Sequence, residues 1–454
     1  MNWKKVKLGS ILKESKVVSE FPDTNKRIKV RLKVLGVEKR GIENEVEGAT
    51  KQFVRKAGQF IYGKQNFHKG AFGIVPKELD GFESSSDLPA FDVDKSCLPE
   101  FLFYFFKQGN YYLELSKIAS GVATQRINTS QLFDLEISLP EIEIQKTLLK
   151  NIKILENFGG EISSELTHQL DLIKQMRQAF LREAMQGKLV KSTNTKETGQ
   201  QLLAKIKAEK AQLIADKKLK KEKELSPISE DEIPFEIPEH WSWCRLGELS
   251  LFSEAGKSFR CNEIVISGDE WGVIKLSAVS WDKFQEDQNK LYSKTKPLDV
   301  SAQILNGDFI ISRANTSELV GKSVVVNSIS KNLLLSDKTI RFKFSDSIST
   351  EFINLCNNTD TARIYYAIKG TGSSPSMKNI KREHMNELLI PLPPLHEQEL
   401  IVAKLEELMS FCDGLEQSIK ESQGYNEMLL QQVLREALQG EKFKNYGSLI
   451  NGKY

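Results

Sequence analysis

The sequence has few cysteines and no long hydrophobic run. Its five cysteines lie far apart, so no CxxC pair is available for zinc or redox chemistry, and an odd number does not suit a disulfide framework. No stretch approaches the roughly 18 uninterrupted apolar residues that a membrane span requires, and residues 1–5 lead into no apolar segment. We therefore expect a cytoplasmic protein with reduced, structural cysteines and no membrane contact.

Net charge is also almost absent. The chain carries 64 Lys and Arg against 61 Asp and Glu, which gives a formal charge of +3 over 454 residues. This balance neither predicts nor excludes nucleic-acid binding, because the position of the charges matters more than their sum. With 40% apolar and 28% charged residues the chain should be globular, and its length predicts more than one domain.

Enzyme motifs are missing as well. Gly256-Lys257-Ser258 and Gly321-Lys322-Ser323 resemble the end of a phosphate-binding loop, but the first glycine of that loop is replaced by Leu251 and Thr316. The five histidines form no HExxH motif and lie near no cysteine at ligand spacing. The sequence therefore predicts no catalytic residue and no metal site.

The chain contains an internal repeat. Residues 181–187 (LREAMQG) recur at 434–440 (LREALQG), displaced by 253 positions with six of seven residues identical. At the same displacement Leu139-Pro140 and Gln145 match Leu392-Pro393 and Gln398, so one register holds over nearly fifty residues. We interpret the chain as a variable block and a helical segment, each present twice.

The two helical segments are predicted by apolar residues that recur every 3.6 positions. Prolines precede each segment, and Gly187 and Gly440 suit the helix ends. A single apolar stripe on so long a helix requires an equally long partner, so we expect a nearly straight antiparallel pair. The residues expected to pack the pair are Leu148, Ile152, Leu155, Ile162, Leu166, Ile173, Phe180, Ile401, Leu405, Leu408, Leu415 and Ile419.

The variable blocks are expected to be α+β modules with basic surfaces. Lys29, Arg31 and Lys33 alternate with apolar residues, which predicts a strand over 28–34 with a row of cations on one face. Such a face can meet phosphate, although an exposed strand whose cations are merely solvated is equally consistent with the pattern. Between the blocks, residues 205–223 predict a charged helix, and the prolines that follow predict an extended linker.

Matching loops in the two blocks also carry cations. The segments 58–64 and 307–313 each begin with glycine, continue as a strand and end in Lys64 or Arg313. Lys69 and Lys322 follow in corresponding places. A third loop, 120–127, matches 371–380, and both contain short donors with Gln, Arg or Lys, which can contact bases or phosphates.

The segment 391–405 (PLPPLHEQELIVAKL), followed by 412–416 (CDGLE), closely resembles the conserved region of type I restriction-modification specificity subunits. The segments 307–313 and 70–76 resemble parts of that family's target recognition domains. The resemblance covers nearly the whole chain. The first copy departs from the pattern at 140–145 (PEIEIQ) and at Gly159-Gly160, which puts in question the docking of a partner there but not the fold.

The resemblance implies a fold with two similar target recognition domains joined by two long antiparallel conserved helices. Each domain would bind one half of a bipartite site in double-stranded DNA, and the helices would set the spacing and dock two methyltransferase subunits. S-adenosylmethionine would belong to those partners, and ATP and Mg to the motor-nuclease subunits that restrict DNA, so this chain would bind no cofactor. The implied segments are 1–140 (first domain), 141–190 (first helix), 191–238 (charged helix and linker), 239–392 (second domain), 393–440 (second helix) and 441–454 (tail).

The predicted DNA contacts divide into two groups. Phosphate contacts are expected from Lys29, Arg31, Lys33, Lys64, Lys69, Arg313 and Lys322. Residues nearer the base edges are Gln65, Gln125, Arg126, Asn315 and Lys378, with Thr124, Ser373 and Ser374 in the same loops.

Two other functions remain open at this point. A specificity subunit of a related system, in which one partner both methylates and cleaves, would be distinguished by the motifs of the neighbouring subunit. A coiled-coil adaptor that binds only protein would show no salt-sensitive binding of duplex DNA. The adaptor leaves the two matched basic modules without a purpose.

Overall fold

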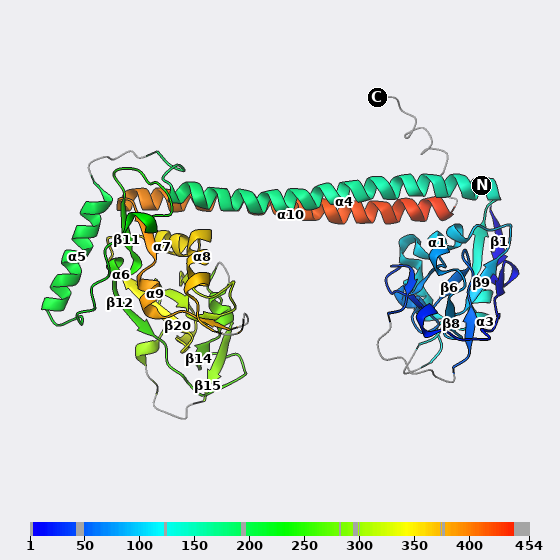
Figure 1. Cartoon of the computed structure of the whole chain (residues 1–454), viewed down its shortest axis with the longest axis horizontal. Coiled ribbons are helices and arrows are strands. Elements are labelled where there is room, and N and C mark those ends of the chain that lie inside the picture. The colour runs from blue at the N-terminus through cyan, green and yellow to red at the C-terminus, as the bar shows by residue number, and fades with distance from the viewer. Residues whose placement is uncertain are drawn as a thin grey trace. The chain divides into compact units, whose positions relative to one another are not determined.

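The computed structural model describes residues 3–41, 50–121, 125–191, 197–280, 283–293, 298, 300–372, 374 and 377–439. Gly440 and the predicted tail 441–454 lie outside these residues. The chain divides into two compact units: unit 1 is Met1–Gln169 with Ser418–Tyr454, and unit 2 is Leu170–Gln417 (Figure 1). Both mix helices and sheets, so the predicted α+β class is confirmed. No helix of the described residues is long and apolar enough to cross a membrane.

Unit 1 is built around a four-stranded antiparallel sheet in the order β2-β9-β6-β7. A cluster of fully buried aromatic side chains covers it, with the rings of Phe67 and Phe106 centred 4.9 Å apart. The strands are β1 (Lys4–Lys7), β2 (Leu12–Glu14), β3 (Ile28–Val30), β4 (Val37–Lys39), β5 (Gln52–Val54), β6 (Phe60–Tyr62), β7 (Phe72–Ile74), β8 (Glu83–Ser85), β9 (Ala90–Val93) and β10 (Glu136–Leu139). The helices are α1 (Pro99–Lys107), α2 (Tyr111–Glu114) and α3 (Thr129–Asp134).

Unit 2 repeats this sheet in the order β12-β20-β16-β18 and adds a second four-stranded sheet, β13-β15-β14-β19. Its strands are β11 (Ser242–Arg245), β12 (Ser250–Ala255), β13 (Cys261–Asn262), β14 (Trp271–Ile274), β15 (Asn289–Tyr292), β16 (Phe309–Ser312), β17 (Ala314–Asn315), β18 (Ser323–Val325), β19 (Asn332–Leu334), β20 (Thr339–Phe344), β21 (Lys378–Asn379) and β22 (Leu389–Leu392). Its short helices are α6 (Leu246–Leu249), α7 (Thr350–Asn357), α8 (Asp360–Lys369) and α9 (Arg382–Asn386).

The predicted tandem repeat is visible in the backbone pairing. Strand β1 pairs with β10 in unit 1, and β11 pairs with β22 in unit 2, both antiparallel. The N–H of Leu8 donates to the carbonyl of Leu135 at 2.8 Å, and the N–H of Leu246 donates to that of Leu388 at 2.9 Å. Each variable block thus closes its first strand against the strand that leads into a long helix.

Two long helices span both units. Helix α4 (Ile142–Met185) has 44 residues and α10 (Leu395–Gln439) has 45. In unit 1 the amide of Asn426 donates to the carbonyl of Gly159 at 2.9 Å, and in unit 2 the guanidinium of Arg177 pairs with Asp413 at 2.7 Å. In unit 1 the start of α4 (Leu148) shares a buried cluster with the end of α10 (Leu438), and in unit 2 the end of α4 (Met185) shares one with the start of α10 (Ile401). The helices therefore pair antiparallel as predicted.

The predicted packing seam needs two corrections. Leu148, Ile152 and Ile173 are buried in α4, and Ile401 and Leu405 are buried in α10. Leu155, Leu166, Phe180, Leu408 and Ile419 are half-buried. The predictions for Ile162 and Leu415 are wrong, because these side chains are 49% and 36% exposed. Periodicity alone does not distinguish the seam from a second apolar face beside it.

Each long helix is fastened to its block by a buried glutamine of the repeat. In unit 1 Gln145 accepts from the N–H of Leu98 at 2.8 Å and donates to the carbonyls of Ser96 and Pro140. In unit 2 Gln398 accepts from the N–H of Ser349 at 3.0 Å and donates to the carbonyl of Pro393. Both side chains are fully buried, so the conserved repeat position is an anchor of the helix start.

The departure of the first copy at 140–145 has a local consequence. In unit 2 the buried carboxylate of Glu397 accepts from Trp241 at 3.1 Å and lies 2.8 Å from His240. The corresponding residue of unit 1 is Ile144, which offers no acceptor, and the indole N–H of Trp3 is buried without a partner among the described residues.

The charged segment also differs in extent from the prediction. Helix α5 (Gly199–Ala215) begins before the predicted residue 205 and ends before 223. Its end is set by Lys217, which has a positive φ of 61°. Residues 220–229 that follow have no regular secondary structure, as expected for a linker.

Candidate nucleic-acid interface

The loop after β6 holds the main cluster of predicted DNA contacts in unit 1. The N–H of Lys64 donates to the carbonyl of Asp87 at 3.0 Å, and the carbonyl of Lys64 accepts from Ile127 at 2.9 Å. Ser120 and Arg126 form an antiparallel bridge that closes the neighbouring loop, which brings Gln125 and Arg126 next to Lys64. Three segments far apart in the sequence therefore meet at one place.

Unit 2 repeats this arrangement bond for bond. The N–H of Arg313 donates to the carbonyl of Lys338 at 2.9 Å, and the carbonyl of Arg313 accepts from Ile380 at 2.8 Å. Thr371 and Asn379 form the antiparallel bridge that corresponds to Ser120 and Arg126. Since the backbone geometry is shared while the side chains differ, the two clusters, which we call the target loops, present different groups on the same frame.

Lys33 and Lys69 lie beside each other in unit 1, but not on a strand. The predicted strand over 28–34 is wrong beyond Val30, because Lys33 and Val34 have positive φ values of 56° and 59°. The N–H of Lys33 donates to the carbonyl of Lys69 at 2.8 Å, and that of Val34 donates to Gly70 at 2.9 Å. A Cβ atom at Gly70 would lie 2.8 Å from the nitrogen of Val34, so only glycine permits this approach.

The cations at the hairpin of β3 and β4 share one acid. Lys29 and Arg31 lie 3.4 and 3.5 Å from the carboxylate of Glu38, and all three side chains are exposed by 40% or more. Exposed pairs of this kind contribute about 0–1 kcal/mol, so phosphate can replace Glu38 at little cost. Two cations on one carboxylate also leave a net positive charge at the hairpin.

The side chains of the target loops fall into available and engaged groups. Among the described residues, the side chains of Lys64, Gln65 and Gln125 have no hydrogen bond or ion pair, and Arg126 has only a 3.8 Å contact with Asp87. These groups are free to contact a ligand. Thr124 and Ser373 lie outside the described residues.

Several side chains of unit 2 that were predicted to contact DNA form hydrogen bonds within the loops. The amide of Asn315 donates to Ser280 at 3.2 Å, and its oxygen accepts from Thr316 at 2.9 Å. The ammonium of Lys378 donates to the carbonyl of Gly372 at 2.7 Å. Arg313 and Lys322 are half-buried and Ser374 is exposed in the same region. A structural role therefore accounts for the contacts of Asn315 and Lys378.

Sequence patterns missed a basic hollow beside the target loop of unit 2. The hollow has a volume of about 640 Å³, and its lining contains four lysines and two acids. Lys275 and Lys290 pair with Glu263, Lys338 pairs with Asp337, and Lys257 is the fourth lysine, so the lining keeps a net positive charge. The carbonyl of Lys338 accepts from the N–H of Arg313, so the hollow and the target loop adjoin. The internal repeat could have pointed to this hollow, because Lys338 occupies the position in unit 2 that corresponds to Asp87 in unit 1.

His68 was also missed. It lies between the buried Phe67 and the exposed Lys69, and its Nδ1 atom is buried without a partner among the described residues. Burial and then the neighbouring Lys69 lower the pKa of His68, so its ring is neutral near pH 7. A neutral imidazole can donate or accept one hydrogen bond at the edge of the target loop.

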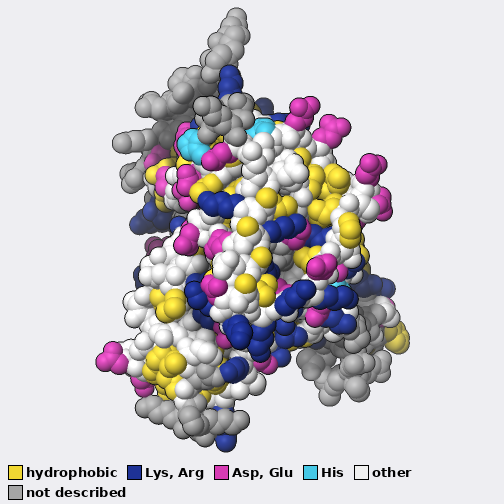
Figure 2. Space-filling view, turned by 90° about the vertical axis from the view of Figure 1, so that its left-hand side faces the viewer, with side chains coloured by type: hydrophobic (Ala, Val, Ile, Leu, Met, Phe, Trp, Pro, Cys, Tyr) yellow, Lys and Arg dark blue, Asp and Glu magenta, His cyan; other side chains and the backbone are white. Residues whose placement is uncertain are grey.

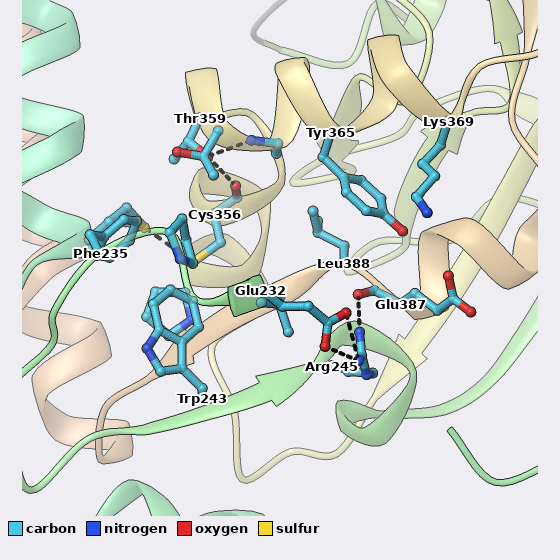
Figure 3. A pocket seen from close by; sticks show the side chains of 16 residues that line it. Glu232, Phe235, Trp243, Arg245, Cys356, Thr359, Tyr365, Lys369, Glu387 and Leu388 are labelled. Carbon is cyan, nitrogen blue, oxygen red and sulfur yellow. Dashed lines mark hydrogen bonds and ion pairs between the residues drawn. The ribbon is translucent and has the colours of Figure 1, made fainter. Parts of the chain in front are cut away.

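A separate apolar pocket of unit 2 lies between α8, β22 and the linker (Figure 3). The rings of Phe235 and Trp243 lie 5.1 Å apart on one side, and Arg245 pairs with Glu232 at 2.9 Å on the other. A hydrogen bond from Ser229 and the guanidinium of Arg245 hold the pKa of Glu232 below its usual range. Burial raises the pKa of the Cys356 thiol, so this lining supplies no activated nucleophile. The contacts of Phe235 with Trp243 and of Glu232 with Arg245 hold the linker against the rest of unit 2.

The titratable side chains and cysteines of the described part of the chain bear on metal binding. No group of three or more His, Cys, Asp or Glu residues there is placed to hold a metal ion. All five cysteines are free, and four of them are buried. The fold and the target loops instead define a protein with two similar candidate DNA-binding units.

Comparison with known proteins agrees with that class. The sequence matches the family described as "Type I restriction modification DNA specificity domain" over residues 1–172 and 238–422. The chain therefore belongs to this family, as the sequence resemblance predicted. Two matched stretches correspond to the two variable blocks with their helices.

Individual relatives carry the same description. The chain is 35% identical over 253 residues to the EcoEI specificity subunit of Escherichia coli, which covers 55% of this chain and 43% of that protein. It is 29% identical to the EcoAI specificity subunit of Escherichia coli over 59% of this chain and 44% of that protein. The aligned region thus spans about half the length of these relatives.

Solved structures show the same fold. A chain from a structure on complex assembly and conformational transition of the type I restriction-modification system has a TM-score of 0.66 at 17% identity, covering 97% of this chain and 98% of that one. The HsdS subunit from Thermoanaerobacter tengcongensis has a TM-score of 0.53 at 17% identity, covering 97% of both chains. At this identity the likeness establishes the fold alone.

Proposed function

We propose that the chain is the DNA-specificity subunit of a type I restriction-modification complex, in which each unit binds one half of an asymmetric bipartite site in double-stranded DNA. The observation that carries this proposal is the pair of target loops. Both are built on the same backbone hydrogen bonds, from Lys64 or Arg313 to the neighbouring loops, yet they present different side chains. A duplicated frame with different side chains suits two half-sites of different sequence.

Within each half-site, cations would hold phosphates and free amides would meet bases. Lys29, Arg31, Lys33, Lys64 and Lys69 are exposed or half-buried on adjoining loops of unit 1, which suits a phosphate track. Gln65, Gln125 and Arg126 have available polar atoms beside it, and glutamine and arginine are residues that distinguish adenine and guanine.

In unit 2 the corresponding track would consist of Arg313, Lys322 and Lys338. The basic hollow next to Lys338 extends the positive surface. Asn315, Ser374 and Lys378 belong to the same loops, and we assign Asn315 and Lys378 the further task of holding the loops in shape.

The helix pair would set the gap between the half-sites. Both α4 and α10 are continuous helices, about 66 Å long at 1.5 Å per residue. The buried anchors Gln145 and Gln398 fix each helix start to its block, so a change in helix length should be transmitted to the target loops.

The same helices would dock two methyltransferase subunits. In unit 1 two exposed apolar residues of α4, Phe158 and Ile162, lie about 40° apart on one helix face at 100° per residue. Each has an exposed apolar counterpart in the part of α10 that belongs to unit 2, at a displacement of 253: Phe411 and Leu415. Two equivalent apolar patches suit two copies of one partner.

Catalysis would then lie in the partners. The methyltransferase subunits would bind S-adenosylmethionine and methylate adenine, and the restriction subunits would use ATP and Mg. We assign this chain no cofactor and no reaction step of its own.

The test is a comparison of genomic methylation in cells with and without this gene. Modification-sensitive sequencing should reveal one bipartite motif whose N6-methyladenine disappears with the gene. Identical methylation in cells that express an active methyltransferase partner would contradict the proposal. Cleavage on both sides of the motif would instead indicate the related system in which one partner methylates and cuts.

A further inference from the structure

Helix α5 and the segment after it concentrate positive charge. Residues 205–223 contain eight lysines against three acidic residues, a larger net charge than the +3 of the whole chain. The remainder of the chain is therefore slightly negative in sum, and this segment is one of two strongly cationic stretches, the other being residues 26–40. Figure 2, which faces the side of α5, shows Lys and Arg side chains gathered on this surface.

Four lysines of this segment lack ion pairs. Among the described residues no acidic group lies within 4 Å of Lys217, Lys220, Lys221 or Lys223, and all four are exposed. We call these four residues the lysine loop. By contrast Lys210 pairs with Glu222 at 3.0 Å, so part of the charge in the segment is already compensated.

The lysine loop is held in place by the fold. Ile206 of α5 is fully buried in the core of unit 2, which docks the helix. After α5 the chain reverses at Lys217, and the N–H groups of Lys218 and Leu219 donate to the carbonyl of Leu213 at 2.9 and 3.1 Å. The ammonium of Lys210 bonds the carbonyl of Ser250 at 2.8 Å. Lys217 is therefore presented from a fixed turn, and the ion pair between Lys210 and Glu222 holds the chain between Lys221 and Lys223.

The composition of this surface favours a hydrated polyanion over a protein partner. The exposed large apolar residues of the described chain include none between 199 and 225. Protein interfaces need an apolar core and are depleted in lysine, whereas phosphate binding by release of counterions needs only accessible cations.

We propose that the lysine loop is a second DNA contact, which binds the phosphate backbone of duplex DNA outside the bipartite site without reading its sequence. It directly follows α5, which packs on β11, β22 and α6, and none of its residues belongs to the strands that carry the target loop of unit 2. It would add affinity for flanking DNA and leave the choice of target unchanged.

The test uses the full chain with its methyltransferase partner and labelled duplexes in fluorescence anisotropy. One duplex ends close to the recognition site, a second carries long flanks, and a third of the same length lacks the site. The variant replaces Lys217, Lys220, Lys221 and Lys223 with Gln. A set with Arg at the same positions keeps the charge, and a Gln set at Lys13, Lys56, Lys77 and Lys95, exposed lysines of unit 1 that carry no proposed contact, is the matched control.

The Gln variant should bind both long duplexes at least about tenfold more weakly at low salt, with a salt slope reduced by about two to four at 0.9 per phosphate. Binding of the short duplex, the Arg variant and the control set should match wild type. Equal binding of long duplexes by wild type and the Gln variant would overturn the proposal. If wild type showed no preference for the recognition site on the short duplex, the proposed function would be contradicted instead. Even then, weaker binding of the third duplex, which lacks the site, by the Gln variant would test the lysine loop.

Discussion

Lengthening both long helices tests whether they set the gap between half-sites. The contacts between α4 and α10 lie within the units, as with Asn426 and Gly159 in unit 1 and Arg177 and Asp413 in unit 2. Insertions at the boundary of the units, after residues 169 and 417, leave these contacts intact. The inserted residues should continue the apolar stripe of each helix.

The expected change follows from helix geometry. Seven residues add about 10.5 Å and fall about 20° short of two full turns, so the buried seam continues. At about 3.4 Å per base pair the gap should grow by about three base pairs. Twenty-five residues add about 37 Å in nearly seven turns, which is about eleven base pairs and close to one turn of DNA.

The two insertions differ in how they present the second half-site. Three base pairs rotate it by about 100° around the duplex axis, whereas about eleven return it to the same side of the DNA. We therefore expect stronger methylation with the longer insertion, at a motif whose halves are unchanged. Modification-sensitive sequencing of cells that carry each variant measures the gap directly. An unchanged gap in a folded, methylating variant would refute the role of the helices.

Four further predictions concern single residues. Lys64→Ala should weaken binding of all DNA sequences alike and lower the salt slope by about 0.9, measured by anisotropy; a changed target motif would contradict its phosphate role. Gln125→Ala should relax one base position of the methylated motif, and an unchanged motif would remove it from the base contacts. Gln145→Ala should lower the free energy of unfolding in urea by about 2–4 kcal/mol because three backbone groups, one of them fully buried, lose the partner that this buried side chain provides, whereas the exposed Gln432→Ala should change it by less than about 0.5 kcal/mol. Glu232→Gln should lower the melting temperature at pH 7, and the difference should vanish as the pH falls through the folded-state pKa of Glu232, because a carboxylate whose pKa is depressed by folding stabilises only while ionised; an equal difference at pH 3 would contradict this.

Local signals in the sequence were sufficient for the helices. The apolar period predicted that the two helices exist, and the prolines before them and Gly187 after the first one predicted their approximate ends. The structure agrees for α4, which ends at Met185, with Gly187 at a φ of 68°. The repeat also placed the two blocks in corresponding roles. The same signals did not separate Ile162 from the seam, because burial depends on which apolar residues meet a partner.

Long-range backbone contacts account for what the sequence did not predict. The alternation through Lys33 indicated a strand, but hydrogen bonds to Lys69 and Gly70 hold Lys33 and Val34 in the left-handed region. The hollow beside Lys338 forms where distant segments meet, so no short motif marks it. Pattern reasoning therefore identified the candidate surface better than the contacts within it.

A pair of buried polar contacts shows how the two units diverged on one frame. In unit 1 Gln59 donates to Asp92 at 2.8 Å, and at the same places of unit 2 Asp308 accepts from Arg341 at 2.9 Å. The acid is Asp92 of β9 in unit 1 but Asp308, directly before β16, in unit 2. In both units the contact still joins the same two neighbouring strands, β6 with β9 and β16 with β20.

The target loops follow the same rule at the surface. Lys64 corresponds to Arg313, Arg126 to Asn379 and Asp87 to Lys338, while each backbone hydrogen bond between these positions is retained. Because the frame depends on N–H and carbonyl groups, side chains in the loops can change without loss of the fold. Different side chains on equal frames would then select different half-sites, so an asymmetric target requires only substitutions in the loops.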